Sequence, residues 1–357
     1  MTTASTPAVR FQSVSKRYGA VTAVHGLSFE IARGTLVTLL GPSGCGKTST
    51  LRLIAGLEHP SSGRILIDGE DVTHLSAAER DVSMVFQSYA LFPHMSVIEN
   101  TTYGLLASGI KRARAEQLAA VKLEAVGLAG FEKRLPSELS GGQQQRVAVA
   151  RAIVLEPKVL LFDEPLSNLD AKLRRRVRDD IRALQQELQL TVVYVTHDQE
   201  EALAVSDRIV VMRGGYIVQD GTPRDLYERP TDAFIADFIG NANLLDVDVR
   251  SCTGDVAEIA LGGAILNVPA SGFSAGPARL AVRPHAIRIA ARGNVAAELA
   301  GTIRKAAYLG GHMEYEITID GVPGEVFVID GQVRSPLAIG TEVVVTIVTS
   351  ETALVSG

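Results

Sequence analysis

Residues 41–48 read Gly-Pro-Ser-Gly-Cys-Gly-Lys-Thr and match the G-x-x-x-x-G-K-[ST] pattern of a phosphate-binding loop. The apolar run Leu36–Leu40 precedes this loop, and residues 48–57 have helical spacing after it. Glycines let backbone N–H groups point inward around a phosphate, and the start of a helix adds partial positive charge. We therefore predict that Lys47 reaches the β- and γ-phosphates of a nucleoside triphosphate and that the Thr48 hydroxyl binds Mg²⁺.

Two carboxylates follow a second apolar run, Val159–Phe162. In phosphate-loop enzymes, a buried strand that ends in aspartate supplies a further contact to Mg²⁺, and Asp163 has that position. The neighbouring Glu164 has the chemistry of a general base that polarises an attacking water. The alternative is a strand that ends in two solvated acids before Pro165. The phosphate loop in the same chain favours the catalytic interpretation.

A third motif places small residues at the start of a helix. Residues 139–146 read Leu-Ser-Gly-Gly-Gln-Gln-Gln-Arg, and helical spacing continues to Leu155. A serine and two glycines at a helix N-terminus form a second anion-binding end, although the same residues are also typical of an N-cap and a tight turn. Because one nucleotide has a single γ-phosphate, we interpret this second end as one that reaches the nucleotide of a partner subunit.

Short apolar runs alternate with helical stretches over the first two thirds of the chain. Polar residues or glycines bound each run, as expected of strands that are buried on both faces. This order predicts an α/β domain with a largely parallel central sheet. The predicted strands are residues 36–40, 82–86, 159–162, 191–195 and 208–212, and the predicted helices are residues 48–57, 113–126, 141–155 and 171–188.

The pattern changes near residue 240. The small and polar segment 239–243 is typical of a domain junction, and beyond it β-like runs follow one another between Gly, Pro and Asp. We predict an α/β domain at residues 1–240 and a small all-β barrel at residues 241–357. The β-like runs are residues 259–261, 278–282, 314–319, 324–329 and 341–348.

The composition narrows the class of protein. Lys and Arg total 35 against 40 Asp and Glu, and a net charge of -5 disfavours nucleic-acid binding through bulk charge. The cysteines, Cys45 and Cys252, lie far apart in sequence and form no disulfide framework, which fits a reducing compartment. We find no signal-like segment and no apolar stretch long enough to span a membrane, so we expect a cytoplasmic protein. The basic run 172–178, followed by two aspartates, predicts a solvated helix face.

Together, the motifs resemble those of the ATP-binding subunits of ABC transporters, over nearly the whole chain. The Leu-Ser-Gly-Gly-Gln signature at residues 139–143 accompanies the phosphate loop and the acidic pair in the family's order and spacing. Gln87 is similar to the Q-loop glutamine, which senses Mg²⁺ and the membrane partner. Asp170, at the end of Ser167-Asn168-Leu169-Asp170, is similar to the D-loop aspartate, which communicates across a dimer. His197 resembles the switch histidine at the γ-phosphate, and Tyr18 resembles the aromatic residue that stacks on adenine.

The resemblance implies three groups of site residues. Glu164, His197 and Gln87 are expected to be catalytic. Thr48, Gln87 and Asp163 are expected to hold Mg²⁺. The residues expected to bind ATP are Tyr18, Gly41, Pro42, Ser43, Gly44, Cys45, Gly46, Lys47, Thr48, Ser49, Ser140, Gly141, Gly142, Gln143 and Asp170.

The C-terminal part resembles the small β-barrel regulatory domain called TOBE. Residues 282–287, 301–303 and 308–310 carry this resemblance. The domain occurs in importer subunits for polyamines, ferric iron, sulfate, phosphonates and sugars. Residues 69–74 and 162–170 most resemble ferric-iron importers, so we expect ferric iron, with polyamine, phosphonate, sulfate or sugar-phosphate import as alternatives.

The resemblance also implies partners and a mechanism. Two chains would form a head-to-tail homodimer, with each ATP between the phosphate loop of one and residues 140–143 of the other. Closure and ATP hydrolysis would move integral membrane permease subunits at the cytoplasmic face of the plasma (inner) membrane. Contact would be made through the aromatic stretch 86–95, and an extracytoplasmic solute-binding protein would be an indirect partner.

The sequence between the phosphate loop and the signature distinguishes this chain from other classes of ATPase. Related proteins of DNA repair insert a long coiled coil between phosphate loop and signature, and this chain has no heptads there. We therefore expect no nucleic-acid partner. A soluble regulatory ATPase with a ligand-sensing barrel is the alternative from another class.

Overall fold

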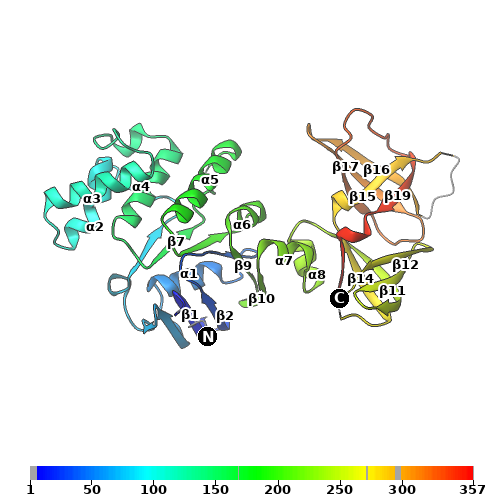
Figure 1. Cartoon of the computed structure of the whole chain (residues 1–357), viewed down its shortest axis with the longest axis horizontal. Coiled ribbons are helices and arrows are strands. Elements are labelled where there is room, and N and C mark those ends of the chain that lie inside the picture. Colours follow the sequence, from blue (N-terminus) through cyan, green and yellow to red (C-terminus); the bar gives the residue numbers. More distant parts are fainter. Residues whose placement is uncertain (1–5, 168, 271, 294–298, 357) are drawn as a thin grey trace. The chain divides into compact units, whose positions relative to one another are not determined.

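The computed structural model describes residues 6–167, 169–270, 272–293 and 299–356. The chain divides into two compact units, Met1–Pro223 and Arg224–Gly357 (Figure 1). The first unit contains two sheets and six helices among its described residues, and the second is built mainly of strands.

The central sheet of the first unit has the order β10–β9–β3–β8–β7–β6. Every neighbouring pair is parallel except β9 and β10, which confirms the prediction of a largely parallel sheet. Apolar residues fill both faces of its inner strands, so they read as continuous apolar runs. The strands are β3 (Leu36–Leu40), β6 (Val82–Val85), β7 (Val159–Asp163), β8 (Val192–Thr196), β9 (Arg208–Arg213) and β10 (Tyr216–Gly221).

A second, antiparallel sheet in the order β2–β1–β4–β5 was not predicted from the sequence. The register of β1 shifts at several points, and Ser13 has a φ of 50°, so the alternation of buried and exposed residues is interrupted. Phe11 and Phe29 pack across β1 and β2 with ring centroids 4.7 Å apart. The strands are β1 (Val9–Tyr18), β2 (Val21–Ile31), β4 (Ser62–Ile67) and β5 (Glu70–Asp71).

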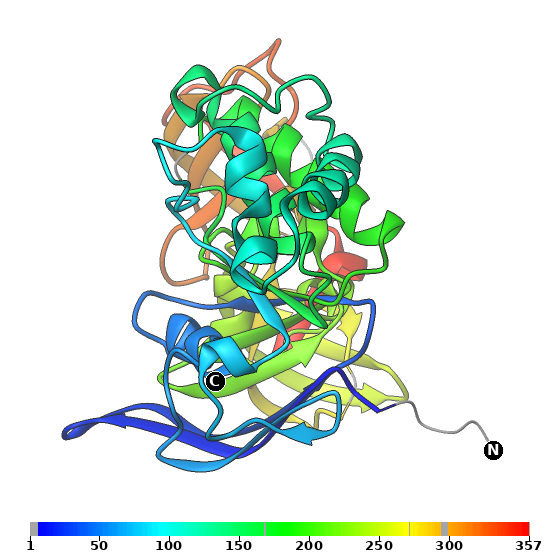
Figure 2. The same cartoon turned by 90° about the vertical axis from the view of Figure 1, so that its left-hand side faces the viewer.

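Three helices of the first unit form a subdomain of their own. Helices α2, α3 and α4 contact one another, and both views show them grouped away from the antiparallel sheet (Figures 1 and 2). Among the described residues, none of the helices combines the length and the apolar character needed to span a bilayer. The helices are α1 (Lys47–Ala55), α2 (Val97–Ala107), α3 (Arg112–Ala125), α4 (Gly141–Ile153), α5 (Ala171–Glu187) and α6 (Gln199–Val205).

The second unit contains two five-stranded antiparallel sheets, β13–β12–β11–β14–β20 and β15–β19–β16–β17–β18. Buried residues of both sheets form one hydrophobic core, which confirms the all-β character of this part. The strands are β11 (Asn243–Thr253), β12 (Val256–Leu261), β13 (Ala264–Pro269), β14 (Gly276–Val282), β15 (Ile287–Ala291), β16 (Ala300–Tyr308), β17 (Met313–Ile319), β18 (Val326–Asp330), β19 (Glu342–Ile347) and β20 (Thr352–Val355).

Two short helices, α7 (Pro223–Glu228) and α8 (Ala233–Phe238), precede these sheets. The buried Arg283, directly after β14, donates to the carbonyl oxygens of Tyr227 at 2.5 Å and Ala236 at 2.7 Å, and to that of Ile239. These bonds tie both helices to the second unit. The compact division falls after Pro223, the first residue of α7, whereas the boundary predicted after residue 240 follows both helices.

Candidate active site

The parallel register brings three loops to one edge of the central sheet. Leu40 lies opposite Thr196, and Asp163 lies opposite Val195. Strands β3, β7 and β8 are neighbours, so the loops that follow them begin side by side at their carboxyl ends. The phosphate loop, Glu164 and His197 consequently lie at the same edge.

Close packing against neighbouring strands explains why two positions of the phosphate loop are glycine. A Cβ atom on Gly41 would lie 2.2 Å from the carbonyl oxygen of Met212 on β9. Gly46 has a φ of 101°, and a Cβ there would lie 2.6 Å from the carbonyl oxygen of Ala23 on β2. A larger residue at either position would push the loop away from the strands that support it.

Lys47, the first residue of α1, is buried and held within the loop. Its Nζ donates to the carbonyl oxygens of Gly41 at 2.6 Å and Pro42 at 3.0 Å, and lies 3.7 Å from Sγ of the buried Cys45. These contacts place the ammonium charge inside the loop that precedes the helix N-terminus. The charge and the helix end together favour a phosphate group.

A hydrogen-bonded network joins three of the predicted residues. His197 Nδ1 lies 3.1 Å from Glu164 Oε2. The Ser167 hydroxyl donates to the Glu164 carbonyl oxygen at 3.0 Å, and Gln87 Nε2 donates to the same hydroxyl at 2.9 Å. Ser167, which we had placed in the D-loop motif without a role of its own, is thus the link between Gln87 and Glu164.

The backbone of Glu164 is strained. Its φ of 44° is in the left-handed region, which non-glycine residues rarely adopt. Its N–H donates to the carbonyl oxygen of Val195 at 3.0 Å, which holds the turn after β7 against β8. Such strain is characteristic of residues whose position matters for function.

Asp163 has the electrostatics of a cation ligand. Burial raises the pKa of this carboxyl and the adjacent Glu164 raises it further, whereas Arg52 on α1 lowers it. A nearby cation would relieve both unfavourable effects. The carboxylate of Asp163, the hydroxyl of Thr48 and the amide oxygen of Gln87 are hard oxygen ligands, and this donor set fits Mg²⁺. Sequence reasoning missed Arg52, which no motif marks.

The predicted anion-binding end at Ser140 is the N-terminus of α4. The Ser140 hydroxyl accepts from the Gln143 N–H at 3.4 Å, and Gln143 Oε1 accepts from the Ser140 N–H at 2.9 Å, which completes a capping box. A Cβ on Gly141 would lie 3.2 Å from Leu169, and one on Gly142 would lie 3.0 Å from Leu173. In the described part of the chain, no hydrogen bond or ion pair joins residues 140–143 to the phosphate loop.

The remaining predicted residues lie outside this network. Tyr18, 42% exposed, is at the end of β1 with Lys16 Nζ 4.9 Å from its ring centre. Asp170 caps α5 by accepting from the Leu173 N–H at 2.9 Å. Asn168, part of the predicted D-loop, lies outside the described residues.

The aromatic stretch 86–95 is partly exposed and partly packed against the rest of the first unit. Phe86 is exposed, whereas Tyr89 is buried and has a left-handed backbone with a φ of 60°. Arg151 on α4 donates to the carbonyl oxygens of Tyr89 at 2.9 Å and Ala90 at 2.6 Å. This arginine, which sequence reasoning missed, fixes the segment after Gln87 to the helix that begins at the signature.

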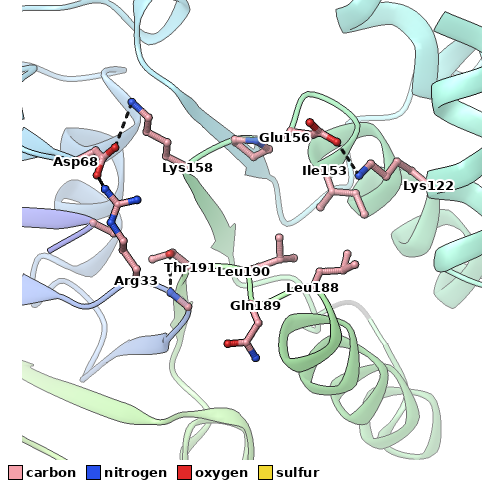
Figure 3. Close-up of a pocket in the computed structure, with 13 residues that line it drawn as sticks. Arg33, Asp68, Lys122, Ile153, Glu156, Lys158, Leu188, Gln189, Leu190 and Thr191 are labelled. Carbon is pink, nitrogen blue, oxygen red and sulfur yellow. Dashed lines mark hydrogen bonds and ion pairs between the residues drawn. The ribbon is translucent and has the colours of Figure 1, made fainter. Parts of the chain in front are cut away.

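A pocket of about 380 Å³ lies at the opposite edge of the central sheet, before β3, β7 and β8 (Figure 3). Figure 3 shows Asp68 between Arg33 and Lys158, and Glu156 directed at Lys122. None of the predicted site residues lines this pocket. The three cations of this pocket each face a carboxylate.

Two family models match the chain. The model described as ABC transporter matches residues 24–167, and the model described as TOBE domain matches residues 280–353. The dimeric structure of MJ0796, a bacterial ABC transporter cassette, is similar to this chain with a TM-score of 0.54 and 30% identity, covering 60% of this chain and 99% of that one.

Curated relatives match along the whole length. The Fe(3+) ions import ATP-binding protein FbpC of Rhizobium etli is 60% identical, with 96% of each chain covered. The Fe(3+) ions import ATP-binding protein FbpC 1 of Rhizobium meliloti is 57% identical, with 100% of each chain covered. The phosphate loop, the acidic pair and the signature described above thus occur in a chain that belongs to the ATP-binding, ATP-hydrolysing proteins of ABC transporters, with a C-terminal TOBE domain.

Proposed function

We propose that this chain is the ATP-hydrolysing subunit of an importer for ferric iron. The observation that carries the enzymatic part is the 3.1 Å contact between Glu164 and His197 at the sheet edge that also holds the phosphate loop. The substrate is inferred from the full-length relatives that are named as Fe(3+) import proteins.

Hydrolysis needs a base beside the γ-phosphate. We assign this role to Glu164, whose carboxylate would accept a proton from the attacking water. The water oxygen then bonds to the γ-phosphorus, the bond to the β-phosphate oxygen breaks, and ADP and phosphate are formed. His197 would contact the γ-phosphate while orienting Glu164, and the Ser167–Gln87 pair would hold the turn that carries Glu164.

The nucleotide would be held by residues of two copies of the chain. Lys47 and the loop 41–46 would bind the phosphates, with Tyr18 against the adenine. Residues 140–143 and Asp170 of a second copy would close the site, since in one chain the signature makes no contact with the phosphate loop among the described residues. The dimeric cassette among the solved relatives supports this arrangement. Thr48, Asp163 and Gln87 would hold Mg²⁺, which supplies charge neutralisation at the β- and γ-phosphates.

Transport requires that ATP hydrolysis be coupled to a conformational change of membrane subunits. We propose that the dimer docks on integral membrane permease subunits at the cytoplasmic face of the inner membrane, with an extracytoplasmic solute-binding protein delivering iron. The exposed Phe86 beside Gln87 supports docking at the segment 86–95, because Gln87 is hydrogen-bonded toward Glu164 through Ser167. Residues 1–240 would act as the ATPase domain and residues 241–357 as the regulatory domain.

Uptake measurements test this proposal. Cells that lack the chain are rescued with the wild type or with Glu164→Gln, and labelled ferric iron, putrescine, sulfate and a phosphorylated sugar are offered in parallel. We expect iron uptake alone to be lost and to return only with the wild type. Loss of uptake of one of the other three solutes would identify that solute, rather than ferric iron, as the substrate. Unchanged uptake of all four, in cells whose purified chain still hydrolyses ATP, would favour a soluble regulatory ATPase.

A further inference from the structure

Arg174 connects two loops of the active site. It lies in the first turn of α5, directly after the D-loop 167–170. Its Nη2 donates to the carbonyl oxygen of Leu169 at 3.1 Å, and its Nη1 donates to Asp198 Oδ2 at 3.4 Å. The basic run on this helix predicted a solvated face, but Arg174 is half-buried and spans the D-loop and the loop that carries His197.

The segment 196–198 around His197 is held by its own set of bonds. The Thr196 hydroxyl accepts from the Asp198 N–H at 3.0 Å and donates to Glu201 Oε2 at 2.8 Å. Asp198 Oδ1 accepts from the Glu201 N–H at 3.1 Å and caps α6. His197 therefore lies between two residues whose side chains are both fixed, and Asp198 is the one that faces Arg174.

Glu201 provides a second carboxylate for the same arginine. It is 4% exposed, and its Oε1 lies 3.8 Å from Nε of Arg174. That Nε–H is buried without an acceptor in hydrogen-bond range among the described residues. This cluster lines a small cavity of about 80 Å³ together with Glu164, Ser167 and His197. Arg174 thus stands behind the catalytic pair and makes no contact with the phosphate loop in the described structure.

Leu169, the D-loop residue whose carbonyl oxygen Arg174 contacts, also lies close to the signature. Leu169, whose carbonyl oxygen accepts from Arg174, is buried, and a Cβ on Gly141 would lie 3.2 Å from its side chain. A displacement of the signature helix would therefore press on Leu169. Arg174 is the side chain through which that displacement can reach Asp198 and His197.

We propose that Arg174 is a positioning residue that fixes the segment 196–198 to the D-loop and thereby sets where His197 stands relative to Glu164. This inference rests on the proposed ATPase function. Because Arg174 leaves the phosphate loop untouched, its loss slows the chemical step without weakening ATP binding. A misplacement of a catalytic group by about 1 Å can cost on the order of 100-fold in rate.

The test compares Arg174→Met with a matched control, Arg176→Met, in the full-length chain. Arg176 is exposed on the same helix and makes no hydrogen bond or ion pair to any residue that the structure describes. We expect Arg174→Met to lower kcat by roughly 10- to 100-fold with the half-saturating ATP concentration unchanged. Arg176→Met should match the wild type. Arg174→Lys should recover part of kcat, because an ammonium reaches one partner but cannot span both.

A double-mutant cycle with Asp198→Asn separates positioning from general destabilisation. If Arg174 acts through Asp198, the two single variants and the double variant lose similar amounts of kcat. Fully additive losses, or a kcat for Arg174→Met within about twofold of the wild type, would overturn the inference. If Arg174→Met fails to fold, as judged by its thermal melting, Asp198→Asn alone must show the same fall in kcat at unchanged half-saturation. Absence of ATPase activity in the wild type would contradict the proposed function instead.

Discussion

Replacement of Glu164 by glutamine is the perturbation whose effect the structure predicts most sharply. The amide has nearly the shape of the carboxylate, so the turn fixed by the bond from the Glu164 N–H to the carbonyl oxygen of Val195 should persist. The amide oxygen is not basic, however, and cannot take a proton from water. General-base catalysis contributes about 10²- to 10⁴-fold, so kcat should fall by that factor.

This fall corresponds to about 2.7–5.4 kcal/mol of lost transition-state stabilisation, since each tenfold step is about 1.36 kcal/mol. ATP binding should be retained, because Lys47 and the phosphate loop make no contact with Glu164 in the described structure. The assays are phosphate release under saturating ATP and equilibrium binding of a fluorescent ATP analogue. Glu187→Gln is the control, since Glu187 is an exposed carboxylate of the same unit.

Two results would contradict the assignment of Glu164 as the general base. A fall in kcat of less than about tenfold would mean that Glu164 is not the base. Loss of ATP binding together with turnover would mean that Glu164 supports the fold of the site rather than its chemistry.

Three further predictions concern the fold and the electrostatics of the site. Gly41→Ala should abolish ATP binding, because its Cβ would lie 2.2 Å from the carbonyl oxygen of Met212; normal binding would contradict the role of this close packing. Arg283→Met should destabilise the second unit by roughly 2–5 kcal/mol, because the carbonyl oxygens of three residues lose a buried donor; an unchanged unfolding transition in calorimetry would be evidence against this. Burial and the adjacent Glu164 raise the pKa of Asp163 above 3.8, so the free energy of unfolding of the wild type should fall relative to that of Asp163→Asn as the pH rises through the raised pKa. Urea unfolding of the nucleotide-free chain at a series of pH values measures this difference, and parallel stability curves for the two proteins would contradict the prediction.

The motifs of the candidate active site were predictable because each is local in the sequence. A glycine-rich loop after a buried strand fixes the phosphate-binding end, and two acids after another strand must emerge at the same edge of a parallel sheet. The register of β3, β7 and β8 places them there. The apolar runs of these strands are continuous, so their pattern identifies them directly.

The antiparallel sheet was not predictable in the same way. The register shifts of β1 and the left-handed backbone at Ser13 break the alternation on which strand prediction depends. Helices α7 and α8 are short, and their sequence pattern did not show that Arg283 would tie them to strands far along the chain.

The positions of supporting side chains also depend on tertiary contacts. A run of basic residues predicts a solvated helix face, but Arg174 turns toward Asp198, 24 positions along the chain. Tyr89 belongs to an aromatic stretch for which the sequence left membrane-partner contact and core packing both open, and in the structure it is buried. A local sequence pattern does not predict which residue of a charged or aromatic run will contact residues that are distant in the sequence.

In the proposed mechanism each ATP lies between two copies of the chain, and a pair of variants tests this most directly. Lys47→Ala disables the phosphate loop and Ser140→Arg disables the signature, so each homodimer has no intact site. When both are co-expressed with different tags and purified over both tags, the mixed dimer keeps one site with a native loop and a native signature. We expect ATP turnover by the mixed dimer that neither variant shows alone. A mixed dimer as inactive as the single variants, or no recovery of a dimer, would contradict it.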